Sequence, residues 1–156
     1  AIMLMGITFN VINGVLIGKG LFSFPPSCFD EGAAFLVTAD GTTVFHAGDL
    51  NWWHWEGEDV GWNRNMEVDF KRYTEPLRGR RLDLAMLPLD PRLGEPGFWG
   101  PRHFLELADI RRFLPMHQWG DFSFTEKFLA EYPGFAPLTL PVSETGQVFA
   151  WKEDIP

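Results

Sequence analysis

The sequence contains a single cysteine, Cys28, among its 156 residues. One cysteine cannot form an intrachain disulfide, and it cannot supply the several thiolates of a structural zinc site. A chain without disulfides fits a reducing compartment, so we expect a cytoplasmic location.

Positive charge is also scarce. The chain has 13 lysine and arginine residues against 21 aspartate and glutamate residues, which gives a net charge of −8. Nucleic-acid binding depends on basic side chains that neutralise phosphates. We therefore expect no nucleic-acid partner, and a small-molecule substrate is the more natural ligand.

Long apolar runs are missing as well. Residues 1–15 are largely apolar but are interrupted by Gly6, Asn10 and Asn13, whereas a helix that crosses a bilayer needs about 18 or more apolar residues in succession. The same segment lacks the basic start of a signal peptide, so no membrane partner is expected. The chain enters strand-like sequence directly at Ala1, and we expect that it begins partway through a domain.

Hydrophobic residues are plentiful: they make up 46% of the chain, and aromatic residues make up 15%. This composition predicts a folded protein with a core that contains many rings. The length suits one compact domain, and no repeat or linker divides it. We therefore assign residues 1–156 to a single domain.

The pattern of apolar residues predicts a mixed architecture. Asp40-Gly41 indicates a hairpin turn between two short apolar runs, and helical spacing appears after residue 60. The strands are expected at residues 2–9, 11–17, 33–39, 42–45, 82–89, 112–116, 138–142 and 147–151, and the helices at residues 63–77, 101–107 and 122–131. The last helix is expected to be capped by Ser123 or Asp121. Strands and helices of this order predict an α/β (α+β) domain.

The most informative segment is residues 44–55, V-F-H-A-G-D-L-N-W-W-H-W. A short apolar run ends there at Gly48-Asp49, and His46, His54 and several tryptophans lie close to the aspartate in sequence. A carboxylate at the end of a buried strand, set among imidazoles, suits metal binding or acid–base chemistry.

Two other apolar runs end in the same kind of residue. Residues 82–89 lead into Asp90, and residues 112–116 lead into His117. If these strands are parallel neighbours of the run before His46, their carboxyl ends meet at one edge of the sheet, where α/β proteins bind ligands. Carboxylate and imidazole groups meeting there predict a divalent-metal site, and a metal would make hydroxide available near neutral pH.

Simpler structural interpretations remain open. Asp49 could cap a turn, Asp90 could pair with Arg92, and His117 could be a hydrogen-bonded structural residue. His46 could face either side of the sheet, and His54 could only stack on its tryptophan neighbours.

The strings H-A-G-D-L-N-W-W-H-W (residues 46–55), P-L-D-P-R (residues 88–92) and L-P-M-H-Q-W (residues 114–119) resemble one branch of the metallo-β-lactamase-fold hydrolases. The resemblance covers roughly residues 35–151. It implies an αββα sandwich with a metal site at one edge, where metal-bound hydroxide attacks an ester, amide, lactone or phosphoester.

The resemblance also implies roles for individual residues. Asp49 would be the catalytic aspartate that bridges two metals, and His117 would be the last histidine ligand. Asp90 and Arg92 would line the site or support it structurally. The metal is typically zinc, and sometimes iron or manganese.

One part of the family pattern is missing. The ligand motif H-x-H-x-D-H should precede the aspartate, but no histidine precedes His46. Asp30 is the obvious substitute for a further upstream ligand, and His46 or His54 could complete the set. The chain is therefore interpreted either as a member that is incomplete at its N-terminus or as an inactive binding or assembly module.

An incomplete domain would expose a sheet edge and an apolar face. We therefore expect self-association into a homo-oligomer. A metal-independent enzyme that uses Cys28 is a third hypothesis, and nothing in the sequence supplies the base that such a thiol would need.

Overall fold

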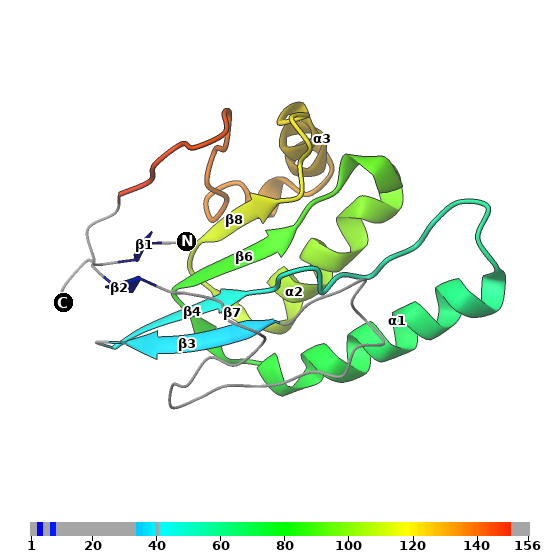
Figure 1. Cartoon of the computed structure of the whole chain (residues 1–156), viewed down its shortest axis with the longest axis horizontal. Helices are drawn as coiled ribbons and strands as arrows, with labels where there is room; N and C mark the ends of the chain where they lie inside the picture. Colours follow the sequence, from blue (N-terminus) through cyan, green and yellow to red (C-terminus); the bar gives the residue numbers. More distant parts are fainter. Residues whose placement is uncertain (1–2, 5–6, 9–33, 40, 151–156) are drawn as a thin grey trace.

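The computed structural model describes residues 3–4, 7–8, 34–39 and 41–150. Its centre is a four-stranded sheet in the order β3-β4-β6-β8 (Figure 1). Strands β3 (Phe35–Ala39) and β4 (Thr42–His46) form an antiparallel hairpin. Strands β6 (Leu84–Pro88) and β8 (Phe113–Met116) continue the sheet in parallel with β4. The expected parallel arrangement of the three strands that lead to polar residues is confirmed.

In the part of the chain that the structure describes, three α-helices accompany the sheet: α1 (Val60–Thr74), α2 (Trp99–Leu107) and α3 (Ser123–Glu131). Phe45, Ala85 and Phe113 are register partners on three neighbouring strands and therefore share one face. On this face the ring of Phe45 lies 5.4 Å from Phe104 of α2, and that of Phe113 lies 6.2 Å from Phe128 of α3. The helices thus bury the apolar side of the sheet, and the α/β class is confirmed.

Helix α1 forms where the sequence places apolar side chains at helical spacing. Met66, Phe70 and Thr74 are four residues apart and all are buried, so one face of the helix packs inward. The side chain of Asp59 accepts a hydrogen bond from the Trp62 amide at 3.0 Å and caps the first turn. The helix begins at Val60, three residues earlier than expected, because this cap precedes the first apolar residue of the pattern.

Two short pairs of strands lie outside the main sheet. Strands β5 (Arg81–Leu82) and β7 (Asp109–Ile110) pair in parallel. Strands β1 (Met3–Leu4) and β2 (Ile7–Thr8) pair antiparallel, so the prediction of one strand over residues 2–9 is wrong. The strand expected at residues 11–17 lies outside the described residues.

Both predicted C-terminal strands are wrong within residues 138–150. The first is reduced to a bridge between Thr139 and Phe113, with Leu140 donating from its amide to the Phe113 carbonyl at 2.8 Å. Pro141 follows and has no N–H to continue the ladder. Residues 147–150 form no strand. The cap of α3 also differs from the prediction: the residue before the helix is Phe122, without a capping side chain.

The chain between β6 and α2 packs tightly on the end of β6. A Cβ atom added at Gly97 would lie 2.5 Å from the backbone oxygen of Asp90 and 3.1 Å from the Phe124 ring. Gly97→Ala is therefore expected to destabilise the protein by about 1–3 kcal/mol, because backbone must move to make room. Urea unfolding measures this change.

Gly134→Ala is the matched control for that measurement, because a Cβ atom there meets nothing within 4 Å. It should change stability by less than about 0.5 kcal/mol. Equal stabilities of the two variants would show that the contact at Gly97 is not a tight one.

None of the helices in the described ranges is long and apolar enough to cross a bilayer.

Candidate metal centre

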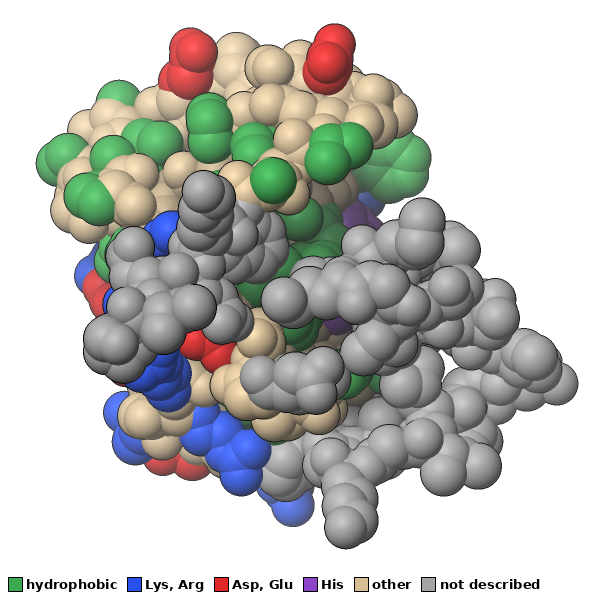
Figure 2. Space-filling model, turned by 90° about the vertical axis from the view of Figure 1, so that its left-hand side faces the viewer, with side chains coloured by type: hydrophobic (Ala, Val, Ile, Leu, Met, Phe, Trp, Pro, Cys, Tyr) green, Lys and Arg blue, Asp and Glu red, His purple; other side chains and the backbone are tan. Residues whose placement is uncertain are grey.

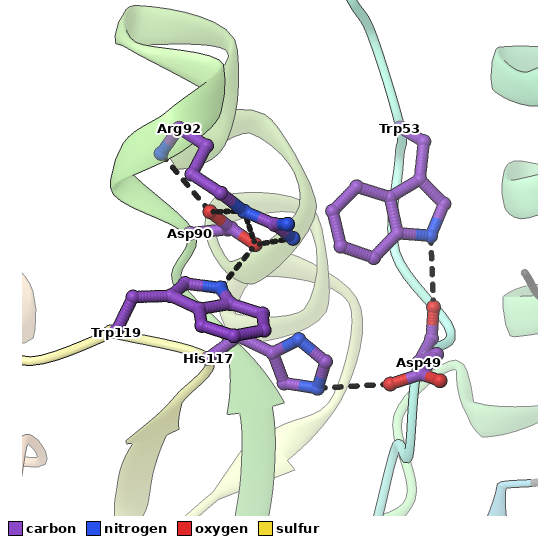
Figure 3. Close-up of polar contacts among 6 residues, drawn as sticks. All are labelled: Asp49, Trp53, Asp90, Arg92, His117 and Trp119. Atoms are coloured by element: carbon purple, nitrogen blue, oxygen red, sulfur yellow. Dashed lines mark hydrogen bonds and ion pairs between the residues drawn. The ribbon is translucent and has the colours of Figure 1, made fainter.

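Asp49 and His117 meet at the carboxyl edge of the sheet (Figure 3). The Nε2 atom of His117 lies 3.0 Å from Oδ1 of Asp49. One residue follows β4 and the other follows β8, which are separated in the sheet by β6. Both side chains are partly accessible, with 22% of His117 and 36% of Asp49 exposed. The structure therefore brings together the two residues expected to bind metal, and their role as ligands stays a prediction.

The hydrogen bonds between the parallel strands continue past the ends of β4, β6 and β8 and align the residues that follow them. The amide of Ala47 donates to the Met86 carbonyl at 2.9 Å, and the amide of Leu89 donates to the Met116 carbonyl at 2.8 Å. These hydrogen bonds fix the chain within two residues of Asp49, Asp90 and His117. The carboxyl edge of the sheet that carries these three residues, called the rim below, is therefore positioned by the sheet itself and not by a free loop.

The Asp49 turn is anchored from both sides. Gly48 adopts a φ of 58°, in the left-handed region that glycine enters without strain. Leu50, which follows Asp49, is fully buried, and the indole Nε1 of Trp53 donates to the Asp49 carbonyl at 2.9 Å. Asp49 is thus held at the carboxyl edge of the sheet, with its backbone immobilised.

His46 supports this turn. Its Nδ1 accepts a hydrogen bond from the Gly48 amide at 2.9 Å, so the neutral ring carries its proton on Nε2. Burial and the nearby His117 lower the pKa of His46, against smaller raising effects of a backbone hydrogen bond and of Asp49. In this state neither ring nitrogen offers a lone pair to a metal, and His46 orients the Asp49 turn.

His117 has an unusual backbone conformation. It adopts a φ of 60°, and Trp119 adopts a φ of 50°, both in the left-handed region that costs a residue with a Cβ about 1–3 kcal/mol. Between them, Gln118 is buried and donates from Nε2 to Thr125 of α3. The strain is thus held by packing and hydrogen bonding, and it turns the two rings toward the rim.

Asp90 forms a closed ion pair. Its side chain is fully buried, and both oxygens accept hydrogen bonds from Arg92, the shortest of them from Nη2 at 2.6 Å. The indole of Trp119 donates to Oδ2 at 3.1 Å (Figure 3). Burial raises the pKa of Asp90, but the hydrogen bonds from Arg92 and Trp119 outweigh it and leave the pKa lowered. With its oxygens engaged, Asp90 supports the site and is poorly placed to bind metal.

Aromatic rings surround the pair. The Trp53 ring lies 6.2 Å from that of His117 and is stacked on Trp55 at 6.0 Å with an interplanar angle of 4°. The Arg92 guanidinium lies 5.6 Å from the Trp55 ring and 4.3 Å from the Trp119 ring. No role for Trp119 is predicted from the sequence, where the signal for this residue is its proximity to His117.

Trp52, Trp53, Trp55 and Trp62 are close in sequence but lie in different places in the structure. Trp52 packs on Trp99 at 5.3 Å and on Phe70 at 6.3 Å, under the helices. Trp62 lies on α1. Of these four, Trp53 and Trp55 belong to the surroundings of Asp49 and His117.

His103 and the remaining sequence candidates do not join the pair. The ring of His54 packs on Trp99 at 4.9 Å, and His103 of α2 contacts the Thr74 hydroxyl of α1 at 3.1 Å. Asp30 and Cys28 lie outside the described residues. In the ranges that the structure describes, no group of three or more His, Cys, Asp and Glu side chains is close enough to hold a metal ion.

The pair itself fits a metal in chemistry and spacing. Two zinc ligands at about 2.0–2.1 Å in a tetrahedral arrangement lie roughly 3.3 Å apart, close to the 3.0 Å between Oδ1 and Nε2. Carboxylate oxygen and imidazole nitrogen suit zinc, iron or manganese. A catalytic zinc usually has three protein ligands, and Asp49 and His117 could account for two of them.

The chain is similar to a protein with a related chemical description. Over 108 residues it is 31% identical to a protein named UPF0173 metal-dependent hydrolase from Heliobacterium modesticaldum. The match takes in 67% of this chain and 36% of the relative, so the chain spans about a third of the relative's length. No protein-family model and no solved structure matches the chain. This similarity extends over two thirds of the chain and is to a protein whose name describes a metal-dependent hydrolase.

Proposed function

We propose that this chain carries part of the active site of a metal-dependent hydrolase, with Asp49 and His117 as metal ligands. The observation that carries the proposal is the 3.0 Å contact between Asp49 Oδ1 and His117 Nε2. These side chains come from the ends of two strands that are parallel to β6, at the edge where α/β sheets bind ligands. The named relative supports the reaction class.

Each neighbouring residue has a part in this proposal. Asp49 supplies the negative charge that attracts a cation, and His46 and Trp53 hold its backbone through hydrogen bonds at 2.9 Å. His117 supplies an imidazole nitrogen from a left-handed backbone conformation that fixes its ring. A bound divalent metal would acidify water and polarise an ester, amide, lactone or phosphoester group.

The further ligands belong to the proposal too. Asp30 remains the candidate from this chain, and it lies outside the described residues. The αββα sandwich is likewise proposed, because the described strands of the main sheet form one sheet with helices on the face of Phe45 and Phe113.

The test is to strip the protein of metal and then add zinc, manganese or iron(II) separately. A panel of ester, amide, lactone and phosphodiester substrates should be hydrolysed only after metal is restored. Activity that is the same in the stripped and the restored protein would contradict the proposal.

A catalytically inactive binding module is the second candidate. The observation in its favour is that no third ligand joins Asp49 and His117 among the described residues. A module of this kind should show no hydrolysis with any metal, and its melting temperature should not change on chelation, because a bound ion stabilises the folded state.

A further inference from the structure

Trp119 is an exposed tryptophan that is nevertheless held in one position. Its side chain is 67% exposed. Its indole Nε1 donates to the buried Asp90 at 3.1 Å, and the Arg92 guanidinium lies 4.3 Å from the ring centre. The ring therefore stays fixed without being buried.

The backbone adds to this rigidity. Trp119 lies between His117 and Gly120, and all three residues have a positive φ. The values are 60° for His117, 50° for Trp119 and 86° for Gly120. A left-handed φ is costly for a bulky residue. Here it presents an indole face to solvent two residues from the proposed metal ligand His117.

We infer that Trp119 is a stacking platform for a planar aromatic group of the substrate, whose reacting bond lies at Asp49 and His117. The position of the reacting bond rests on the proposed function, whereas the stacking of an aromatic group on Trp119 does not. A ring that is already immobilised loses little conformational entropy when a ligand binds. Planar groups stack well on such a face.

The electrostatics favour an aromatic group over a cationic one. Arg92 already occupies one face of the Trp119 indole, and a cation there draws electron density from the ring. A second cation on the opposite face would be repelled, whereas a neutral aryl ring would be attracted. The Trp53 ring lies on the other side of Arg92 and His117 (Figure 3). The Trp55 ring, which is stacked on Trp53, extends the apolar surroundings.

Two carboxylates of similar size test this inference: 2-naphthoate, which is planar, and its fully saturated decahydro counterpart, which is not. Their affinities for the full chain are measured by calorimetry. The carboxylate can reach a metal equally in both compounds, so their ratio of affinities reports stacking alone. We expect 2-naphthoate to bind roughly tenfold more tightly than the saturated compound, the scale of one stacked ring.

Variants separate stacking from structural support. Trp119→Ala should remove the preference for 2-naphthoate, whereas Trp119→Phe should keep most of it, although neither variant can donate to Asp90. Trp62→Ala is the control, because Trp62 is the other exposed tryptophan of the described residues, at 38%, and lies on α1. It should leave the ratio unchanged.

The inference is overturned if the two compounds bind equally, if neither binds, or if Trp119→Phe loses as much as Trp119→Ala. Metal content is measured on the same samples. A preference for 2-naphthoate in a protein that takes up no metal would support the platform and contradict the proposed hydrolase.

Discussion

Replacing Asp49 by asparagine or His117 by alanine is expected to abolish the stabilisation that added metal gives to the protein. A metal present at 100 times its dissociation constant stabilises the folded state by about 2.7 kcal/mol. For a chain of this size that corresponds to a rise of roughly 5–10 °C in melting temperature. Hydrolysis should fall at least about 100-fold in both variants, the upper end of losses seen for residues that only support metal ligands.

His54→Ala is the matched control, since His54 belongs to the same segment as Asp49 but packs on Trp99. Thermal unfolding with and without metal should give the wild-type shift for this variant. A shift that survives in Asp49→Asn and His117→Ala would place the metal elsewhere in the protein.

Asp90→Ala is expected to be the most destabilising of the substitutions proposed, by about 3 kcal/mol. The change removes a fully buried carboxylate and leaves the Arg92 guanidinium and the Trp119 indole without that acceptor. This loss of stability is at the low end of those found when one partner of a buried ion pair is removed, because 46% of the Arg92 side chain is exposed and water can solvate it. Urea unfolding at pH 7 measures the difference.

The exposed pair of Arg102 and Glu106 provides the comparison for Asp90. Its side chains are 46% and 53% exposed, so Arg102→Ala should cost less than about 1 kcal/mol. Equal costs for the two variants would mean that burial of Asp90 adds nothing to the strength of its pair.

The stability should also depend on pH through Asp90. Its pKa is lowered in the folded protein, so the folded state binds its proton less readily than the unfolded chain does. The stabilisation is present above the unfolded pKa of about 3.9 and is lost as the pH falls through the lower folded value. Asp90→Asn should make the free energy of unfolding depend less steeply on pH in this acidic range. An unchanged dependence on pH would contradict the assigned ion pair.

Much of the sheet was predictable because its strands carry local signals. Asp40-Gly41 marks the hairpin of β3 and β4, and the apolar run before Asp90 matches β6, in which every residue is buried. The C-terminal strands failed because apolar alternation does not show whether a partner strand is available. There, the chain makes one bridge at Thr139, and Pro141 follows.

The site was predictable only as far as strand endings determine it. Asp49 and His117 could be paired because each follows a strand of the same parallel set. The contact of Trp119 with Asp90 spans 29 residues in sequence. It depends on the left-handed conformation of His117 and Trp119, and neither residue type signals that conformation. The hydrogen bond of Trp53 to the Asp49 carbonyl depends in the same way on how the turn closes.

The proposed metal site is tested most directly by a crystal of the protein grown with zinc, with diffraction measured on both sides of the zinc absorption edge. We expect an anomalous peak about 2.0–2.2 Å from both Asp49 Oδ1 and His117 Nε2. An ordered rim without a peak between these two atoms, or a zinc peak bound only elsewhere, would contradict it.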